Sequence, residues 1–477
     1  MNDKKDIKDE NVVLLYPPVV LNSTSKFGLP PLGLLYLASS LDKAGIKVCV
    51  IDAQIHRMGM DDIINKVMEK KPTIVGITMN TETVLIILEI IKKLKEKDSL
   101  LKIVVGGPHV NSTKDEIFEY TTNIDCLVYG EGEETMVELV KNFGKDIPGV
   151  IYPNKKFKTR PLKDNLDELP LINLNYIDDY EPYKIFYGSG RKAGSLMTTR
   201  GCPYRCIFCN VFVTSGKKYR KMSPDRVIEE IKNLQKNWGI NYICFKDSTF
   251  TLDREWTTSL CNKILENKLD IEWRCNTRVD LIDRELLLLM KKSGCKCINY
   301  GVESGSPRIL KILKKDITIE RIKEVFKLTH EIGGIETHGG FMIGNPEETL
   351  EEVKQTIKLA IELNPHYAAF DITTAFPGTE LYDYAISHNL IKDPRWYMKG
   401  GNDKENKLII SSKKDAWLKC EFDQEKMISK AYKSYYMRPS FVLRTIKKII
   451  KNPSFLSVVT EAMPEIFNIK FISGDKK

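Results

Sequence analysis

The chain has 477 residues, which is too long for one ordinary hydrophobic core, so two or three domains are expected. Hydrophobic residues make up 42% and charged residues 29% of the chain, which excludes a disordered or fibrous protein. The net charge of +9 is modest for this length and does not indicate nucleic acid as a partner, so none is expected.

Eleven cysteines occur in a chain whose first residues contain no apolar signal segment. We therefore expect a reducing, cytoplasmic setting, in which thiols serve metals rather than disulfides. The longest uncharged apolar stretch, Gly28 to Leu41, contains two prolines and is too short to cross a bilayer. No transmembrane segment is expected.

In residues 10–150, apolar runs of strand length alternate with helical patterns. Strands are expected at 12–16, 47–51, 73–77, 102–105 and 126–129, and helices at 32–44, 61–70, 83–97, 114–120 and 135–143. This alternation predicts a doubly wound, Rossmann-like α/β domain whose ligand crevice lies at the carboxyl ends of the strands.

The ends of these expected strands carry several glycines and polar residues. They are Tyr16-Pro17-Pro18, Asp52, Thr78-Met79-Asn80, Gly106-Gly107-Pro108-His109 and Gly130-Glu131-Gly132-Glu133. Glycine at such a place lets the backbone approach a large ligand, although tight turns alone would explain it equally well. No G-x-G-x-x-G follows the first strand, so a dinucleotide is not expected.

Residues 151–190 are rich in proline, aspartate and lysine and are expected to be a linker. In residues 191–392 the alternation resumes. Strands are expected at 194–199, 242–246, 271–276, 297–302, 335–343 and 368–374, and helices at 224–238, 254–267, 283–292, 318–332 and 349–363. Six such repeats predict a partial (β/α)6, TIM-like barrel with its site at the carboxyl face.

Three cysteines with the spacing C-x3-C-x2-C follow the first strand of this barrel: Cys202, Cys206 and Cys209. The next cysteine is Cys244, so a fourth ligand is missing nearby. Three cysteines on one loop can bind three irons of a cuboidal iron–sulfur cluster and leave the fourth iron open. A structural zinc site would need four protein ligands.

The spacing, with Phe208 before the last cysteine, resembles the radical S-adenosylmethionine (SAM) superfamily. The resemblance implies a [4Fe–4S] cluster on Cys202, Cys206 and Cys209, which cleaves SAM reductively to a 5′-deoxyadenosyl radical. It also implies a low-potential electron donor of the flavodoxin or ferredoxin type. The residues that the resemblance assigns to SAM are Phe208, Asp247, Arg278, Glu303, Ser304, Gly340 and Gly344.

Within that set the resemblance implies different roles. Asp247 belongs to a polar segment near the SAM amino group, and Glu303 or Ser304 would bind ribose hydroxyls. Arg278 would pair with the SAM carboxylate, although a surface salt bridge explains it equally well. The strand that contains Gly340 and Gly344 would lie behind the adenine.

Residues 10–150 precede the cysteine motif in the sequence and resemble the cobalamin-binding domain of B12-dependent radical SAM proteins. The resemblance implies cobalamin contacts from Tyr16, Thr78, Gly106, Gly107, Pro108, Gly130, Glu131 and Gly132. One departure concerns the cobalt ligand. Cobalamin domains of the methionine-synthase type have D-x-H-x-x-G after the first strand, where this chain has Tyr16-Pro17-Pro18. His56 follows the second strand with the wrong gap, so no histidine is expected on the cobalt.

Residues 393–477 lose the alternation and are expected to be mainly helical, with two helices broken near Pro439. Residues 423–452 contain eight Lys or Arg residues and only two acidic residues. A helix packed on the barrel with a solvated basic face explains this composition, and a peripheral contact with a membrane surface or a lipid substrate is the alternative.

The resemblance therefore implies a cobalamin-dependent radical SAM enzyme, most often a methyltransferase acting on an unactivated carbon of a small-molecule or lipid substrate. Ring closure or rearrangement of the substrate is an alternative. A tRNA methylthiotransferase is disfavoured because its N-terminal domain carries three cysteines, where this chain has only Cys49 and Cys126. A non-catalytic iron–sulfur electron carrier is a hypothesis of another class, against which the SAM motifs argue. The substrate itself leaves no signal in the sequence.

Overall fold

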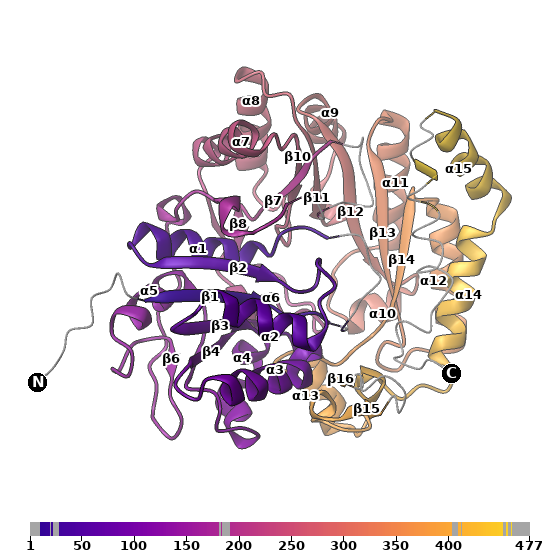
Figure 1. Ribbon diagram of the computed structural model, residues 1–477. Coiled ribbons are helices and arrows are strands. Elements are labelled where there is room, and N and C mark those ends of the chain that lie inside the picture. Colours follow the sequence, from indigo (N-terminus) through magenta and orange to yellow (C-terminus); the bar gives the residue numbers. More distant parts are fainter. Residues whose placement is uncertain are drawn as a thin grey trace, which may run out of the picture.

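Two six-stranded sheets form the centre of the protein, one in each half of the chain (Figure 1). The computed structural model describes residues 10–19, 21, 28–180, 183, 191–402, 409–411, 413–451, 455, 456 and 459. Helices connect successive strands in both halves, which confirms the predicted α/β fold class.

The first sheet has the strand order β2-β1-β3-β4-β5-β6, and only β5 and β6 pair antiparallel. Its strands are β1 (Asn11–Tyr16), β2 (Lys47–Asp52), β3 (Ile74–Thr78), β4 (Lys102–Gly106), β5 (Cys126–Val128) and β6 (Val150–Ile151). From β1 the chain moves to β2 at one edge of the sheet, and from β3 it moves through β4 and β5 toward the other edge, so the strand order reverses between β1 and β3. A ligand crevice is therefore expected outside the carboxyl ends of these strands.

Side chains of β1 alternate between two cores, which explains why helices cover both faces of the sheet. Val12 and Leu14 belong to the core with α1 and α5, and Val13 and Leu15 to the core with α2 and α3. The helices are α1 (Leu32–Lys43), α2 (Met60–Glu69), α3 (Val84–Lys97), α4 (Pro108–Thr113) and α5 (Gly132–Lys141).

One helix differs from the prediction. The helix expected at 114–120 is a 3₁₀ helix at Lys114–Glu119, and it follows the α-helix α4, which begins earlier, at Pro108. Proline has the φ angle of a first helical residue already fixed, so a helix starts there readily.

The second sheet has the order β14-β13-β12-β11-β10-β7 with every pair parallel. Its strands are β7 (Ala193–Leu196), β10 (Tyr242–Phe245), β11 (Glu272–Thr277), β12 (Cys295–Glu303), β13 (Glu336–Ile343) and β14 (Tyr367–Ile372). The two edge strands, β7 and β14, do not pair with each other, so the barrel is open. This confirms the partial (β/α)6 barrel.

Helices on the outside of this barrel have local start signals. They are α7 (Pro224–Trp238), α8 (Arg254–Glu266), α9 (Arg284–Lys292), α10 (Pro307–Ile312), α11 (Ile319–Ile332) and α12 (Leu350–Leu363). Ser223 caps α7 by accepting a hydrogen bond from the Arg226 amide, and Thr349 with Glu352 forms a capping box at α12.

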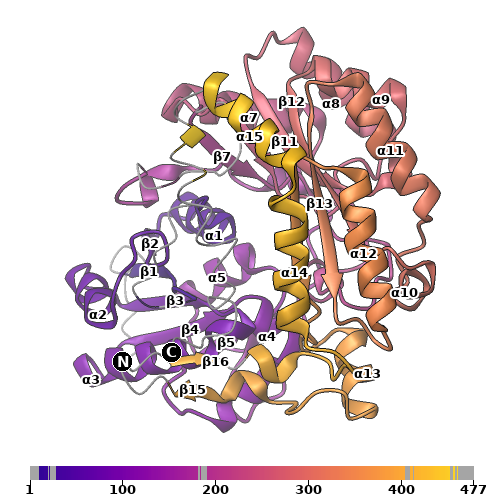
Figure 2. The same ribbon diagram turned by 90° about the vertical axis from the view of Figure 1, so that its right-hand side faces the viewer.

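After the barrel, the chain returns to the first domain and then to the barrel. Helix α13 (Glu380–Ser387) leads to a segment whose Trp396 and Tyr397 are buried in the core of α2 and α3. Helices α14 (Gln424–Tyr436) and α15 (Pro439–Lys451) then run along the open barrel, with their break at Pro439 as predicted (Figure 2). Among the described helices, none combines the length and apolarity that crossing a membrane requires.

Candidate functional site

The three clustered cysteines lie on a loop between two short antiparallel strands, β8 (Thr199–Arg200) and β9 (Arg220–Lys221). Gly201, directly before Cys202, has φ +82°, and a side chain there would collide with the carbonyl of Lys218. Glycine is therefore required for the turn that starts the loop. All three cysteines are half-buried.

Burial and nearby positive charges act in opposite directions on the thiols of this loop. Burial raises the pKa of Cys206, and the positive charges of Lys315 and Arg278 act in the opposite direction. Burial also raises the pKa of Cys209, and the neighbouring thiols Cys206 and Cys202 raise it further. The three thiols are thus close enough to influence one another's ionisation, and at Cys206 two cations partly offset the effect of burial.

The donor set of this loop consists of three cysteines. Within the described ranges, no group of three or more His, Cys, Asp or Glu side chains is arranged to hold one ion. Cysteines that bind three different irons of a cuboidal cluster lie farther apart than the ligands of one ion. The donor set therefore fits an iron–sulfur cluster.

Arg278 is buried, and it forms a salt bridge with Asp280, which lies at the surface. Its guanidinium lies 3.7 Å from the ring centre of Tyr204, in the cysteine loop, and donates to both carboxylate oxygens of Asp280. It also donates to the Lys315 carbonyl at 2.7 Å. Because the side chain is only 5% exposed, Arg278 holds the cysteine loop against the end of β11 rather than reaching into open space.

Asp247 is enclosed as well. Its carboxylate is fully buried and accepts a hydrogen bond from the Thr198 hydroxyl at 2.9 Å. Burial raises its pKa to about 6. Asp247 therefore braces the segment that leads into the cysteine loop, while the adjacent Ser248 is exposed and Thr249 lies 3.9 Å from the Cys202 sulfur.

The remaining residues assigned to SAM fall into two groups. Ser304 is fully buried and its hydroxyl interacts with Thr356 and the Ser306 amide, so it does not face open space. Gly344 faces the side chain of Gln424 in α14, with which a β-carbon would collide.

Three residues are better placed. Phe208 is half-buried beside the small core around Ile207, and a β-carbon on Gly340 would meet only the Tyr300 carbonyl, at 3.9 Å. Glu303 ends β12 with φ +66° and binds Lys315 at 2.7 Å through one carboxylate oxygen.

A cavity of about 730 Å³ lies at the carboxyl ends of the first sheet. Its lining includes all eight residues that the resemblance assigns to cobalamin: Tyr16, Thr78, Gly106, Gly107, Pro108, Gly130, Glu131 and Gly132. The opposite wall comes from the barrel and contains Ser195, Met197, Lys246 and Arg274. Among the described residues that line it there is no histidine.

Glycine is required where this cavity approaches the backbone. Gly107 has φ +103°, and a β-carbon would lie 2.7 Å from the Thr78 hydroxyl and 3.0 Å from the Met79 amide. At Gly132 a β-carbon would lie 2.9 Å from Leu37. The cavity thus has the backbone-lined surface that a large, flat corrin would need.

Elements on both sides of the cysteine loop reach this cavity. Helix α6 (Val211–Ser215) follows Cys209, packs against α4 and contributes Thr214 and Ser215 to the lining. Arg200 precedes the loop and also lines the cavity. The cavity is therefore adjacent to the cysteines rather than remote from them.

Buried ion pairs join the two domains at this point. Arg200 contacts Glu131 at 3.2 Å and Glu133 at 2.6 Å, and Arg220 contacts Glu131 at 2.8 Å. Burial opposes ionisation of Glu131, but the two arginines hold its pKa below the usual value. Sequence analysis predicts Glu131 as a cobalamin contact and does not reveal these partners, because they come from distant parts of the chain.

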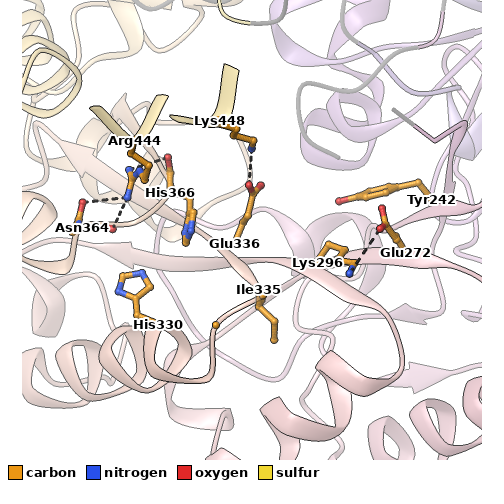
Figure 3. Close-up of a pocket in the computed structure, with 12 residues that line it drawn as sticks. Tyr242, Glu272, Lys296, His330, Ile335, Glu336, Asn364, His366, Arg444 and Lys448 are labelled. Carbon is orange, nitrogen blue, oxygen red and sulfur yellow. Dashed lines mark hydrogen bonds and ion pairs between the residues drawn. The ribbon is translucent and has the colours of Figure 1, made fainter. Parts of the chain in front are cut away.

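A second cavity, of about 660 Å³, lies at the amino ends of β10 to β13 under helix α15 (Figure 3). Lys448 pairs with Glu336 at 2.6 Å, and Arg444 donates to the Pro365 carbonyl at 2.8 Å. None of the residues assigned to the cluster, SAM or cobalamin lines it.

Comparison with known proteins gives two matching family models, the Radical SAM superfamily at residues 196–360 and the B12 binding domain at 18–140. An uncharacterized methyltransferase of Pyrococcus horikoshii is 34% identical over 92% of this chain and 95% of its own. An anaerobic magnesium-protoporphyrin IX monomethyl ester cyclase of Rubrivivax gelatinosus is 29% identical over 74% and 66%.

The fold is also that of a solved structure, the radical S-adenosylmethionine methyltransferase TsrM from Kitasatospora setae with cobalamin and a [4Fe–4S] cluster bound. The TM-score is 0.70 at 20% identity, with 90% of this chain and 92% of that chain covered. The chain belongs to the cobalamin-dependent enzymes of the radical SAM superfamily, whose cofactors are a [4Fe–4S] cluster, SAM and cobalamin.

Proposed function

We propose that this enzyme transfers a methyl group from SAM to an unactivated carbon of a small molecule. The observation that carries the proposal is the cavity that joins the strand ends of the first domain to the barrel wall beside the cysteine loop. Cobalamin in this cavity would then lie next to the cysteine loop, with the reacting carbon between them. When bound, the cofactors supply one-electron chemistry and the methyl group, and the protein supplies position and exclusion of water.

The residues of this chain would act as follows. Cys202, Cys206 and Cys209 hold the cluster, and Arg278 positions their loop through Tyr204. The free carboxylate oxygen of Glu303 is available for a ribose hydroxyl. The open side of β13 at Gly340 provides room for the adenine, with Phe208 beside the cluster. Asp247 and Ser304 act through packing.

Cobalamin would lie against the glycine-rich turns at Gly107 and Gly130, with Tyr16 and Thr78 at neighbouring strand ends. Since no histidine is among the described lining residues, we expect a cobalt without a histidine ligand. Electron paramagnetic resonance of the Co(II) form should be unchanged in His56→Ala. Loss of a nitrogen splitting in that variant would contradict the expectation.

A methyl label tests the proposed reaction. The reconstituted enzyme is given SAM with a deuterated methyl group, a reductant and a small-molecule extract of the cells that make it. The label should appear in a product, together with released 5′-deoxyadenosine. Substrate turnover that leaves the label out of the product would favour ring closure or rearrangement, as the similarity to the Rubrivivax cyclase suggests.

Enzymes of this superfamily need a reductant, and we propose a low-potential protein of the flavodoxin or ferredoxin type. Reduced flavodoxin should support release of 5′-deoxyadenosine by the reconstituted enzyme. A chemical reductant of equally low potential that works where both carrier proteins fail would contradict this choice.

Helix α15 supports a peripheral contact with an anionic membrane surface. Its outer face exposes Val442 (42%), Leu443 (59%), Ile446 (47%) and Ile450 (74%), while Arg444 and Lys448 bind the barrel. Apolar side chains on the outer face and lysines along its edge suit the interface of an anionic bilayer.

Vesicles test this contact. The protein should sediment with phosphatidylglycerol vesicles and less with phosphatidylcholine vesicles, and Ile446→Ser with Ile450→Ser should weaken the binding. As a control, Leu288→Ser changes an exposed leucine on α9, on another part of the barrel (50% exposed). Equal binding by the double variant and the parent would contradict a role of α15.

A further inference from the structure

The barrel wall of the 730 Å³ cavity carries two cationic side chains. Lys246 follows β10, and Arg274 lies on the adjacent strand β11; both line the cavity. In the register of the sheet, Cys244 lies opposite Arg274 on one neighbouring strand and opposite Ser195 on the other, and Lys246 is two residues beyond Cys244. Since alternate residues of a strand share a face, these side chains point to one side of the sheet.

The Lys246 side chain is exposed, and its ammonium group makes no hydrogen bond or ion pair with any residue that the structure describes. Partial desolvation by the cavity walls lowers its pKa, and the charged groups that influence it are the Cys244 thiol and Arg274, with no carboxylate. The carboxylates on the opposite wall, Glu131 and Glu133, are bound to Arg200 and Arg220. They are therefore not available to balance Lys246.

A hydroxyl stands beside these two cations. Ser195, on β7, is 7% exposed and lines the cavity, and its hydroxyl oxygen has no hydrogen-bond partner. A buried polar atom without a partner carries a free-energy cost, which a ligand can relieve. An ammonium, a guanidinium and a hydroxyl along one wall form a donor set for anionic oxygens.

We infer that the substrate carries a carboxylate or phosphate group, which binds Lys246, Arg274 and Ser195 while its reacting carbon faces the cofactors. The inference rests on the proposed methyl transfer and narrows its substrate to anionic small molecules. Two other anions would compete for this wall, the phosphate of the cobalamin tail and the carboxylate of SAM. The experiment separates all three.

The first arm identifies the substrate class. A small-molecule extract of the producing cells is divided on an anion-exchange resin into retained and unretained pools. Each pool is incubated with the reconstituted holoenzyme, reductant and methyl-deuterated SAM. The label should enter a compound of the retained pool. Label only in the unretained pool would overturn the inference and leave methyl transfer standing, whereas label in neither pool despite release of 5′-deoxyadenosine would overturn both.

The second arm tests the wall with Lys246→Gln. Labelling should need about tenfold more of the retained pool, because a charge-assisted hydrogen bond is lost. Cobalamin absorbance, the cluster spectrum and SAM affinity should stay unchanged, and Lys246→Arg should restore most of the labelling. The matched control is Lys296→Gln, a half-exposed lysine at the other end of the barrel. Loss of cobalamin or SAM binding in Lys246→Gln would show that Lys246 serves a cofactor, and would overturn the inference.

Discussion

The positive charges of Lys315 and Arg278 both act to lower the pKa of Cys206. We expect Cys206→Ala to remove the cluster and release of 5′-deoxyadenosine, because two cysteines cannot hold the cube. Iron content and the visible spectrum of the anaerobically reconstituted protein measure the first, and chromatography the second. Cys49→Ala, a half-buried thiol on β2, is the control and should keep both. Release at the parent rate by Cys206→Ala would refute the assignment.

Asp247 should make stability depend on pH in an unusual direction. Burial raises its pKa in the folded protein to about 6, above the usual aspartate value of 3.8, so the folded protein binds more protons between these pH values. Its contribution to stability therefore falls as pH rises from about 4 to 6. The free energy of unfolding of Asp247→Asn, relative to that of the parent, should therefore increase over that pH window by on the order of 3 kcal/mol, since one pKa unit corresponds to about 1.4 kcal/mol.

Chemical denaturation of the cluster-free protein at pH 4.5 and pH 7.5 measures this difference. A gap between variant and parent that is the same at both pH values would mean that the carboxylate is not buried in its charged form.

At the scale of elements, the β4–α4 turn is shaped by Gly107. In Gly107→Val the side chain would meet the Thr78 hydroxyl and the Met79 backbone, and the positive φ adds strain. Cobalamin affinity should fall at least tenfold, measured by titration of the visible spectrum, with the cluster spectrum intact. Gly45→Ala is the control, since Gly45 also has positive φ but has open space around it. Equal losses in both variants would trace the effect to strain alone.

Glu131, directly before α5, forms ion pairs with Arg200 on β8 and Arg220 on β9, and these pairs should stabilise the contact of the two domains. Glu131→Ala leaves Arg220 and part of Arg200 without a buried partner, which costs about 3–5 kcal/mol. The thermal unfolding midpoint should fall accordingly. Glu134→Ala removes a half-exposed partner of Lys163 and should cost less than about 1 kcal/mol. Similar effects of the two substitutions would argue against the bridge.

At the scale of the whole molecule, the chain after the barrel completes the first domain. Trp396 is fully buried, its segment contacts α3, and Tyr397 donates to Glu116 at 2.8 Å. Trp396→Ala should cost about 3–5 kcal/mol and increase hydrogen exchange in the first sheet, although the residue lies beyond the barrel in sequence. Exchange that rises only in the barrel would contradict this packing.

Periodicity was sufficient for every parallel strand of the two six-stranded sheets, but it missed the two-residue antiparallel strand β6. It missed α4 and α10, which are six residues each and too short for a helical repeat to show. It also did not reveal that residues around Trp396 return to the first domain, since a turn in direction leaves no periodic signal.

The candidate site divides in the same way. Cys202, Cys206 and Cys209 could be recognised because one loop holds all three, so their spacing along the chain is also their spacing in space. Gly107 and Gly130 could be recognised because positive φ restricts the residue type. The enclosure of Asp247 and Ser304 could not be predicted, since it depends on which neighbours pack against them.

The sequence by itself determined the fold class, the cysteine loop and the glycine turns, because each depends on interactions between residues close along the chain. Only the tertiary structure decided which charged side chains are bound to partners within the protein and which face a cavity. It paired Glu131 with Arg200 and Arg220, enclosed Arg278 against Tyr204, and left Lys246 facing the cavity without a carboxylate. Charge balance inside a protein is set by distances between remote segments, and those distances exist only once the two domains have packed together.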